Sequence, residues 1–335
     1  MNFKVKDIAR ALNDLTGGRC DKQDAGNSRF FVTKSSGIDG KSVLETPGLV
    51  YGDPEMDVGN AVALAITANE GVIEFMAHKG IKVLITLHPV ADAASSGGVP
   101  LKTYLDLYGI ALFEAHEAFH GLHPGISFLH GHKPFYTNTN FGGIPGCVVH
   151  VGDALRPEVK TVGNMVDRIN RYMNLEQEKR VLAALRSIYG TNKIQNAGVS
   201  LKSRIILGDR DRAVNKVLHI FPHTGFSAAH LKSVKKDNPK IDTMLASISR
   251  VYPGNELIDQ AQDMDLNFIA GNSHINETSE NWIPLGYALQ KRLPGLEVVV
   301  FQDRITSTPL ERFGSKKIRD YGKTMADDYL GGKIT

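Results

Sequence analysis

The sequence predicts an α/β protein with a two-lobe subunit, in which helices flank mixed or parallel central sheets. Apolar runs of strand length alternate with helical segments along most of the chain. This alternation is typical of parallel sheets built from βαβ units. The chain has 335 residues, more than one domain usually contains, so a second lobe is expected.

The first lobe is predicted to comprise residues 1–125 together with about 257–335. Apolar residues at helical spacing predict a first helix, and Gly80 and Gly109 are placed to end two later ones. The expected elements of the N-terminal part are helices over 5–12, 70–78 and 100–107 and strands over 61–66, 81–85 and 110–113. Those of the C-terminal part are strands over 266–270 and 296–301, a helix over 279–293 and a helical tail over 311–335.

The second lobe is predicted to comprise about 126–256. Residues 126 to about 160 are rich in Gly, Pro and Asn, which indicates an insertion with a short strand over 148–151. The elements expected after it are one long helix over 165–189, strands over 216–221 and 241–245, and helices over 227–234 and 255–262.

The composition excludes several classes of protein. The 39 basic and 36 acidic side chains nearly balance, so neither nucleic acid nor a membrane surface is an expected partner. Cys20 and Cys147 are the two cysteines, too few for a disulfide framework, and a cytoplasmic location is expected. The first residues have the pattern of an amphipathic helix and no apolar run approaches the roughly 20 residues that cross a bilayer, so neither secretion nor membrane insertion is expected.

The segment from Gly109 to Gly125 contains the string H-E-x-x-H, formed by His116, Glu117 and His120. In a zinc endopeptidase this string lies within a helix, where two histidines hold the metal and the glutamate is the general base. Here it follows a contiguous apolar run, after a glycine that ends the preceding helix. The string is therefore predicted to leave a strand, and the endopeptidase becomes the less favoured alternative.

Histidines follow three predicted strands: His88, the pair His116 and His120, and His274. Open α/β sheets bind ligands at the carboxyl ends of their strands, so these side chains are expected to converge. Glu277 or Glu280 is expected to add a carboxylate oxygen. Such a set suits zinc, iron or manganese, and the number of imidazoles favours zinc. The alternative for each residue is an ordinary loop or capping role.

Other polar residues are weaker candidates. Glu117 is a general base, a ligand or an exposed carboxylate, and the last is slightly favoured. His130 and His132 are expected to be solvated in the insertion. His223 precedes a helix whose N-terminus could hold an anion. The sequence contains no Walker-type loop for nucleotide phosphates.

Five motifs in order resemble the NIF-three-like dinuclear-metal-centre hexameric family, the GTP cyclohydrolase 1 type 2 homologues. Residues 85–89, Ile-Thr-Leu-His-Pro, resemble its metal-binding "ITHHP" motif. The others are Pro47–Pro54, similar to "GLxxGDP"; Gly109–Gly125, similar to "IAVYAAHTNLDAAPGG"; Lys216–Gly225 with Ile241–Asp242, similar to the second-lobe glycine turn; and Phe268–Leu293, similar to the "GHYxTE" loop and its helix.

The resemblance implies a two-lobe α/β subunit, a toroidal homo-hexamer and two metal ions per subunit. It assigns metal ligation to His88, His116 and His274. The sequence departs from the family pattern at three positions. Leu87 replaces the first histidine of the motif, His120 stands where the family has a ligating aspartate, and Thr278 occupies the place of the carboxylate, flanked by Glu277 and Glu280. One or two ions per subunit are therefore expected.

The leading functional prediction is a metal-dependent hydrolase in which Glu117 is the candidate proton carrier. The resemblance suggests a small molecule or nucleotide such as GTP as substrate. The alternative from another class is a non-catalytic hexameric scaffold or regulator that binds metal.

Overall fold

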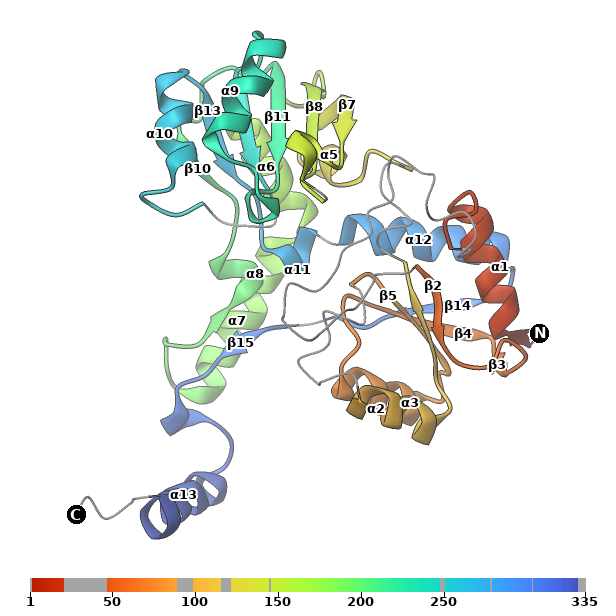
Figure 1. Ribbon diagram of the computed structural model, residues 1–335. Helices are drawn as coiled ribbons and strands as arrows, with labels where there is room; N and C mark the ends of the chain where they lie inside the picture. Colours follow the sequence, from red (N-terminus) through yellow and green to blue (C-terminus); the bar gives the residue numbers. More distant parts are fainter. Residues whose placement is uncertain are drawn as a thin grey trace. The chain divides into compact units, whose positions relative to one another are not determined.

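The structure is a computed structural model that describes residues 2–20, 47–88, 99–115, 122–144, 146–247, 251–277, 279–302 and 304–330 (Figure 1). The chain divides into two compact units. The first consists of Met1–Met173 and Ser203–Asp303, and the second of Asn174–Lys202 and Arg304–Thr335. Within the described ranges, no helix combines the length and the apolar content needed to cross a membrane.

One sheet of the first unit has the strand order β14-β4-β5-β6-β2. Its first four strands run parallel, and β2 pairs antiparallel with β6. Strands β4 and β5 are apolar on both sides because helices α1 and α12 cover one face and α2 and α3 cover the other. The elements are α1 (Val5–Leu15), β2 (Gly48–Tyr51), β4 (Ala61–Ala65), α2 (Glu70–Lys79), β5 (Val83–Thr86), α3 (Val99–Tyr108), β6 (Ala111–Glu114), α12 (Ser279–Arg292) and β14 (Glu297–Val300), with a small pair of β1 (Phe3–Lys4) and β3 (Asp57–Gly59).

The other sheet of the first unit has the order β10-β13-β12-β11-β8-β7. Strands β11, β12 and β13 are parallel, and the outer strands pair antiparallel. Helices α9 and α10 cover one face and α6 covers the other. The elements are α5 (Gly125–Leu129), β7 (His132–Asn138), η3 (Phe141–Gly143), β8 (Val149–Ala154), α6 (Val162–Tyr172), β10 (Arg204–Leu207), β11 (Lys216–Ile220), η4 (Pro222–Thr224), α9 (Ala228–Asp237), β12 (Thr243–Ala246), α10 (Glu256–Asp263), β13 (Asn267–Ala270) and α11 (His274–Glu277).

The α/β class with mixed and parallel sheets agrees with the prediction. The division of the chain differs from the expected one, because β13 pairs with β12 and so belongs to the sheet of the second predicted lobe. The single helix expected over 165–189 is two helices, α6 and α7 (Leu175–Tyr189). Between them Asn174 has a φ of 48°, a left-handed conformation that ends one helix and lets the next begin.

The second unit joins an internal segment to the C-terminal part of the chain. Strand β15 (Thr306–Ser307) pairs antiparallel with β9 (Gln195–Asn196), and the Ala197 amide donates to the Ile305 carbonyl at 3.0 Å. Arg304 forms an ion pair of 3.2 Å with Glu178 of α7. The remaining elements are α8 (Ala197–Ser200), η5 (Leu310–Arg312), α13 (Lys316–Met325) and the π-helical turn η6 (Ala326–Leu330).

Candidate metal site

His88 and His274 come from distant parts of the chain and meet at the ends of two strands. His88 follows β5, where its amide donates to the Ile66 carbonyl at 2.7 Å. His274 begins α11, shortly after β13. Their Nε2 atoms are 2.6 Å apart, and their rings stack with 4.7 Å between centroids and 10° between planes. The predicted convergence of these two residues is therefore present.

The surroundings orient one ring and keep the other neutral. The Thr67 hydroxyl lies 3.1 Å from Nδ1 of His88 and so fixes how that ring is turned. Burial and the neighbouring His88 lower the pKa of His274 to about 4, although Glu277 acts in the opposite direction. His274 is therefore an uncharged imidazole at neutral pH, which is the form that coordinates metals.

His116, Glu117 and His120 lie outside the described residues. The chain reaches them from β6, whose last residue, Glu114, pairs with Thr86 of β5. The Ala115 amide then donates to the Thr86 carbonyl at 3.0 Å. The chain therefore leaves β6 next to β5, the strand that His88 follows. In the sequence, the H-E-x-x-H string comes directly after β6, as predicted.

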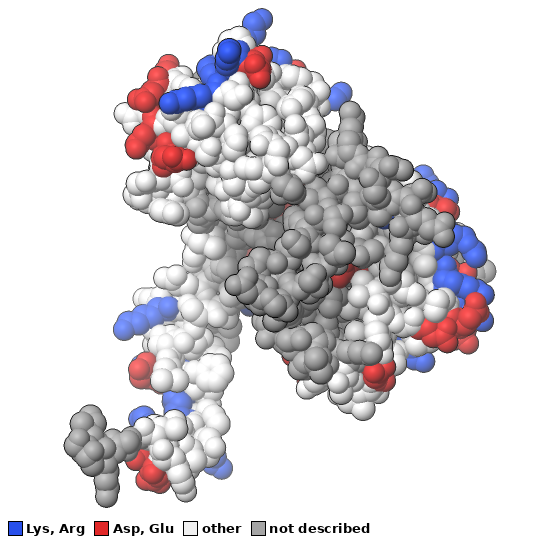
Figure 2. Space-filling model, viewed as in Figure 1, with Lys and Arg blue, Asp and Glu red and all other residues white. Residues whose placement is uncertain are grey.

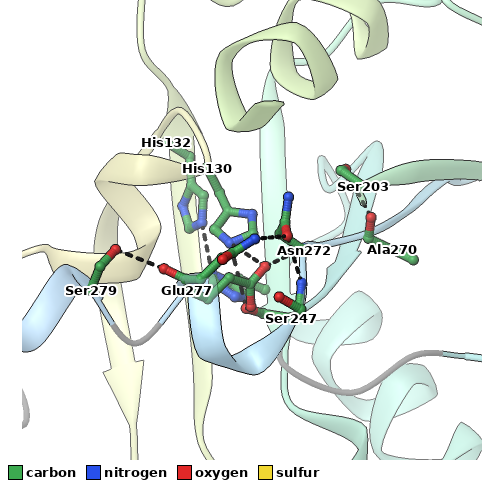
Figure 3. Close-up of polar contacts among 11 residues, drawn as sticks. His130, His132, Ser203, Ser247, Ala270, Asn272, Glu277 and Ser279 are labelled. Carbon is green, nitrogen blue, oxygen red and sulfur yellow. Dashed lines mark hydrogen bonds and ion pairs between the residues drawn. The ribbon is translucent and has the colours of Figure 1, made fainter. Parts of the chain in front are cut away.

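Glu277 is buried, and its carboxylate contacts residues that lie next to the strands β7, β12 and β13 (Figure 3). One carboxylate oxygen lies 3.0 Å from Nε2 of His130 and accepts from the Asn272 amide, and the other accepts from the Ser247 hydroxyl. Both oxygens are already occupied, and through them Glu277, the last residue of α11, is held to the residue after β12 and to the end of α5. The contacts do not favour it as a metal ligand.

Glu280, the other candidate carboxylate, lies half-buried in α12. Burial raises the pKa of Glu280 to about 8, while a hydrogen bond from the Ile126 backbone acts in the opposite direction. Its Oε2 lies so close to Gly125 that a Cβ at that position would clash with it. A carboxyl group that is mostly protonated at pH 7 is a poor ligand.

The sheet that contains β7, β8 and β11 carries a cluster of buried histidines that the sequence analysis did not predict. His130 and His132 are buried, so the expectation that they are solvated was wrong. His132 Nε2 is 3.2 Å from His219 Nδ1, and His150 lies opposite His219 on the neighbouring strand. Burial, with His130 and His150 nearby, lowers the pKa of both His132 and His219 well below 6.5. A histidine within an apolar strand run, as in Val-Leu-His-Ile, was the available signal.

The described residues contain no group of three or more His, Cys, Asp or Glu side chains arranged to hold a metal ion. At the anion site predicted near His223, the helix N-terminus is already capped. The Ser227 hydroxyl accepts a hydrogen bond from the His230 amide of α9, so an anion would compete with it for this donor.

Comparison with solved structures shows which folds this chain resembles. The chain matches reduced HcgD from Methanocaldococcus jannaschii at 14% identity and a TM-score of 0.52, covering 90% of this chain and 98% of that one. It matches a Bacillus cereus protein related to NIF3 at 12% identity and 0.52, with the same coverage. A hypothetical protein of Staphylococcus aureus gives 12% and 0.50, covering 89% and 96%.

The chain has a NIF3-like fold. No family model and no curated protein matches the sequence. The identities are low, so the likeness concerns the fold. Within this NIF3-like fold, Leu87 is buried in the core that α1 and α12 form with the first sheet. The position of the missing motif histidine is thus a packing position.

Proposed function

We propose that the protein binds a divalent transition metal through His88 and His274, with His116 and His120 as the further ligands predicted from the sequence. The observation that carries the proposal is the 2.6 Å approach of two Nε2 atoms from residues 186 positions apart in the chain. Two imidazole nitrogens on one tetrahedral zinc lie about 3.3 Å apart, given Zn–N distances of about 2.0 Å. The observed distance is about 0.7 Å shorter, so the two nitrogens face each other and have to separate by this amount to share one ion.

The chemistry of the donors fits such an ion. His274 is neutral at physiological pH, and the Thr67 hydroxyl holds His88 by the nitrogen that faces away from His274. Outer partners of this kind orient ligating histidines in metal sites. Imidazole donors favour zinc over iron or manganese. Glu277 and Glu280 remain ligands predicted from sequence, but their contacts do not favour them.

As the reaction, we propose hydrolysis of a small molecule, with a nucleotide such as GTP as the first candidate substrate. A divalent metal supplies Lewis-acid catalysis when bound. The protein itself orients the His88 ring through the Thr67 hydroxyl and keeps the His274 ring uncharged by burying it. Glu117 is the proposed proton carrier. The hexamer and the cytoplasmic location belong to the same proposal and come from the sequence resemblance and the cysteine content.

A metal-binding scaffold without turnover is the second candidate, and the burial of Leu87 favours it. Because Leu87 packs in the core, this position adds no ligand to a second ion. One ion held by histidines can serve as a structural site as well as a catalytic one. The zinc endopeptidase is the third candidate and requires Glu117 as the general base.

Metal analysis tests the binding proposal. Purified protein should contain at least about one ion per subunit. The double variant His88→Ala/His274→Ala should lose it, whereas His78→Ala, which changes an exposed histidine of α2, should retain it. Full metal content in the double variant would refute the assignment.

A substrate screen then separates the candidate functions. Metal-dependent turnover of a nucleotide or phosphoester that His88→Ala abolishes supports the hydrolase. If fully metal-loaded protein turns over none of the tested substrates, the result supports the scaffold. Casein cleavage that Glu117→Gln abolishes supports the endopeptidase.

A further inference from the structure

Helix α13 and the turn η6 that follows it carry an apolar stripe that the described residues leave largely exposed. Ile318, Tyr321, Met325 and Tyr329 recur at spacings of three and four residues, which places them along one side of a helix. Ile318, Tyr321 and Tyr329 are 49%, 59% and 76% exposed, and Met325 is half-buried. Within the described chain, α13 and η6 have no buried residue.

This exposure is unusual for a short helix. Helix α13 has 10 residues, and isolated helices below about 12 residues are marginal in water even with favourable sequences. In proteins, packing of the apolar side supplies most of the stability of such a helix. Large exposed apolar patches on a surface mark places where another molecule binds. The stripe is therefore expected to have a partner.

The charges along the segment indicate which partner. Helix α13 carries Lys316, Lys317, Arg319 and Lys323 against Asp320, a formal charge of +3. The C-terminal turn η6 carries Asp327 and Asp328, a formal charge of −2. Figure 2 shows uncharged surface between the charged side chains of this region. The segment has opposite charges at its two ends, with the apolar stripe along its length.

Such a segment is complementary to itself when two copies run antiparallel. The basic end of one copy then lies beside the acidic end of the other, at both ends of the pair, and the apolar stripes meet between them. A two-fold interface has this property, because the same patch serves both partners. A parallel arrangement would instead place like charges together at both ends, which is unfavourable.

We propose that residues 316–330 form an antiparallel helix pair with the same segment of a second copy of this chain, with Ile318, Tyr321, Met325 and Tyr329 as the seam. The occupant of the stripe is thus another subunit. This pairing is independent of the metal site, and it joins two subunits through the second unit.

Light scattering and sedimentation velocity on the full chain provide the first test. The wild-type protein should have at least twice the mass of the variant Ile318→Asp, because the helix pair joins two subunits or two assemblies. Leu310→Asp is the matched control, because Leu310 is 78% exposed in the same unit but lies outside the stripe. It should keep the wild-type mass. Equal masses for wild type and Ile318→Asp would overturn the proposal.

Charge reversal provides a test that does not depend on the apolar residues. Lys316→Glu/Lys317→Glu makes both ends acidic, and Asp327→Lys/Asp328→Lys makes both ends basic. Each double variant should weaken self-association about tenfold or more at low ionic strength, where exposed charges act most strongly. The variant with all four changes restores opposite ends and should associate within about threefold of wild type.

The alternative occupants give distinct results. A four-residue variant that associates as weakly as the two double variants would exclude the antiparallel pair. A wild-type protein that has the mass of Ile318→Asp but sediments with vesicles of phosphatidylcholine and phosphatidylserine would show that a membrane covers the stripe, and would also overturn the proposal.

Discussion

The carboxylate of Glu277 lies 3.0 Å from Nε2 of His130, although the two residues are 147 positions apart in the sequence. Both side chains are buried. The contact holds α11, which begins with His274, against the end of α5. The position of one candidate ligand therefore depends on a residue that caps α5, just before β7.

Removing this carboxylate should destabilise the protein. In Glu277→Ala, three buried groups lose their acceptor: His130 Nε2, the Ser247 hydroxyl and the Asn272 amide. Each buried group without a partner costs about 1–3 kcal/mol, so the free energy of unfolding should fall by at least about 3 kcal/mol. Urea-induced unfolding measures it.

The matched control is Glu74→Ala, which truncates an exposed glutamate of α2. Its effect should stay within about 0.5 kcal/mol, as is usual for surface positions. A loss of under 1 kcal/mol in Glu277→Ala would show that the network does not stabilise the fold.

Acid should destabilise the protein through His132 and His219. Their pKa values are lowered well below 6.5 in the folded chain, mainly by burial. Their contribution is fully present above pH 6.5. As the pH falls below 6.5, the unfolded chain binds protons that the folded chain does not, and stability is lost. The loss approaches about 1.4 kcal/mol per pH unit for each residue.

Unfolding free energies between pH 7.5 and 5.5 check this slope. His219→Gln should reduce it, because one of the histidines with a lowered pKa is gone, whereas the control His78→Gln, at an exposed position, should leave it unchanged. An unaltered slope in His219→Gln would contradict the assignment of acid sensitivity to the buried cluster.

Glu280 should have the opposite effect on pH dependence. Burial raises the pKa of Glu280 to about 8, above its ordinary value of 4.5. Between these values the unfolded chain releases a proton that the folded chain keeps, so this residue lowers stability as the pH rises from 4.5 through 8. Glu280→Gln should therefore stabilise the protein more at pH 8 than at pH 5, in the same unfolding assay. Glu74→Gln should show no such trend.

Thr67 should tune metal affinity if the proposed site is correct. Its hydroxyl lies 3.1 Å from Nδ1 of His88. Loss of an outer partner of this kind typically weakens metal binding about 10–100-fold, and Thr67→Val should do so in a competition titration with a metal chelator. Thr67→Ser keeps the hydroxyl and should bind nearly as well as wild type. Equal affinity in Thr67→Val would show that Thr67 does not orient the ligand.

The sequence was sufficient to predict the parallel part of the first sheet. Its strands are contiguous apolar runs separated by glycine-capped helices such as α2, whose cap Gly80 has a φ of 69°. The same regularity placed His88 and His274 at strand ends, from which their meeting followed. The break at Asn174 was not predictable, because a helical apolar pattern continues on both sides of it.

The buried histidines could not be anticipated from local sequence. His130 and His132 lie in a segment rich in Gly and Pro, which is normally solvent-exposed. Their burial depends on β8 and β11, to which β7 adds as the outermost strand. Likewise, the engagement of Glu277 depends on Ser247 and His130, and neither is near it in the chain.

The pairing of β9 with β15 has a consequence for how this chain could be shortened. The internal segment 174–202 and the tail after residue 303 each supply one strand of a two-stranded ribbon, and neither has another strand partner within the described residues. The two pieces are therefore co-dependent. Cutting the chain at residue 303 would remove β15, the strand with which β9 of segment 174–202 pairs. Segment 174–202 and the tail after residue 303 should therefore be removed or transplanted together.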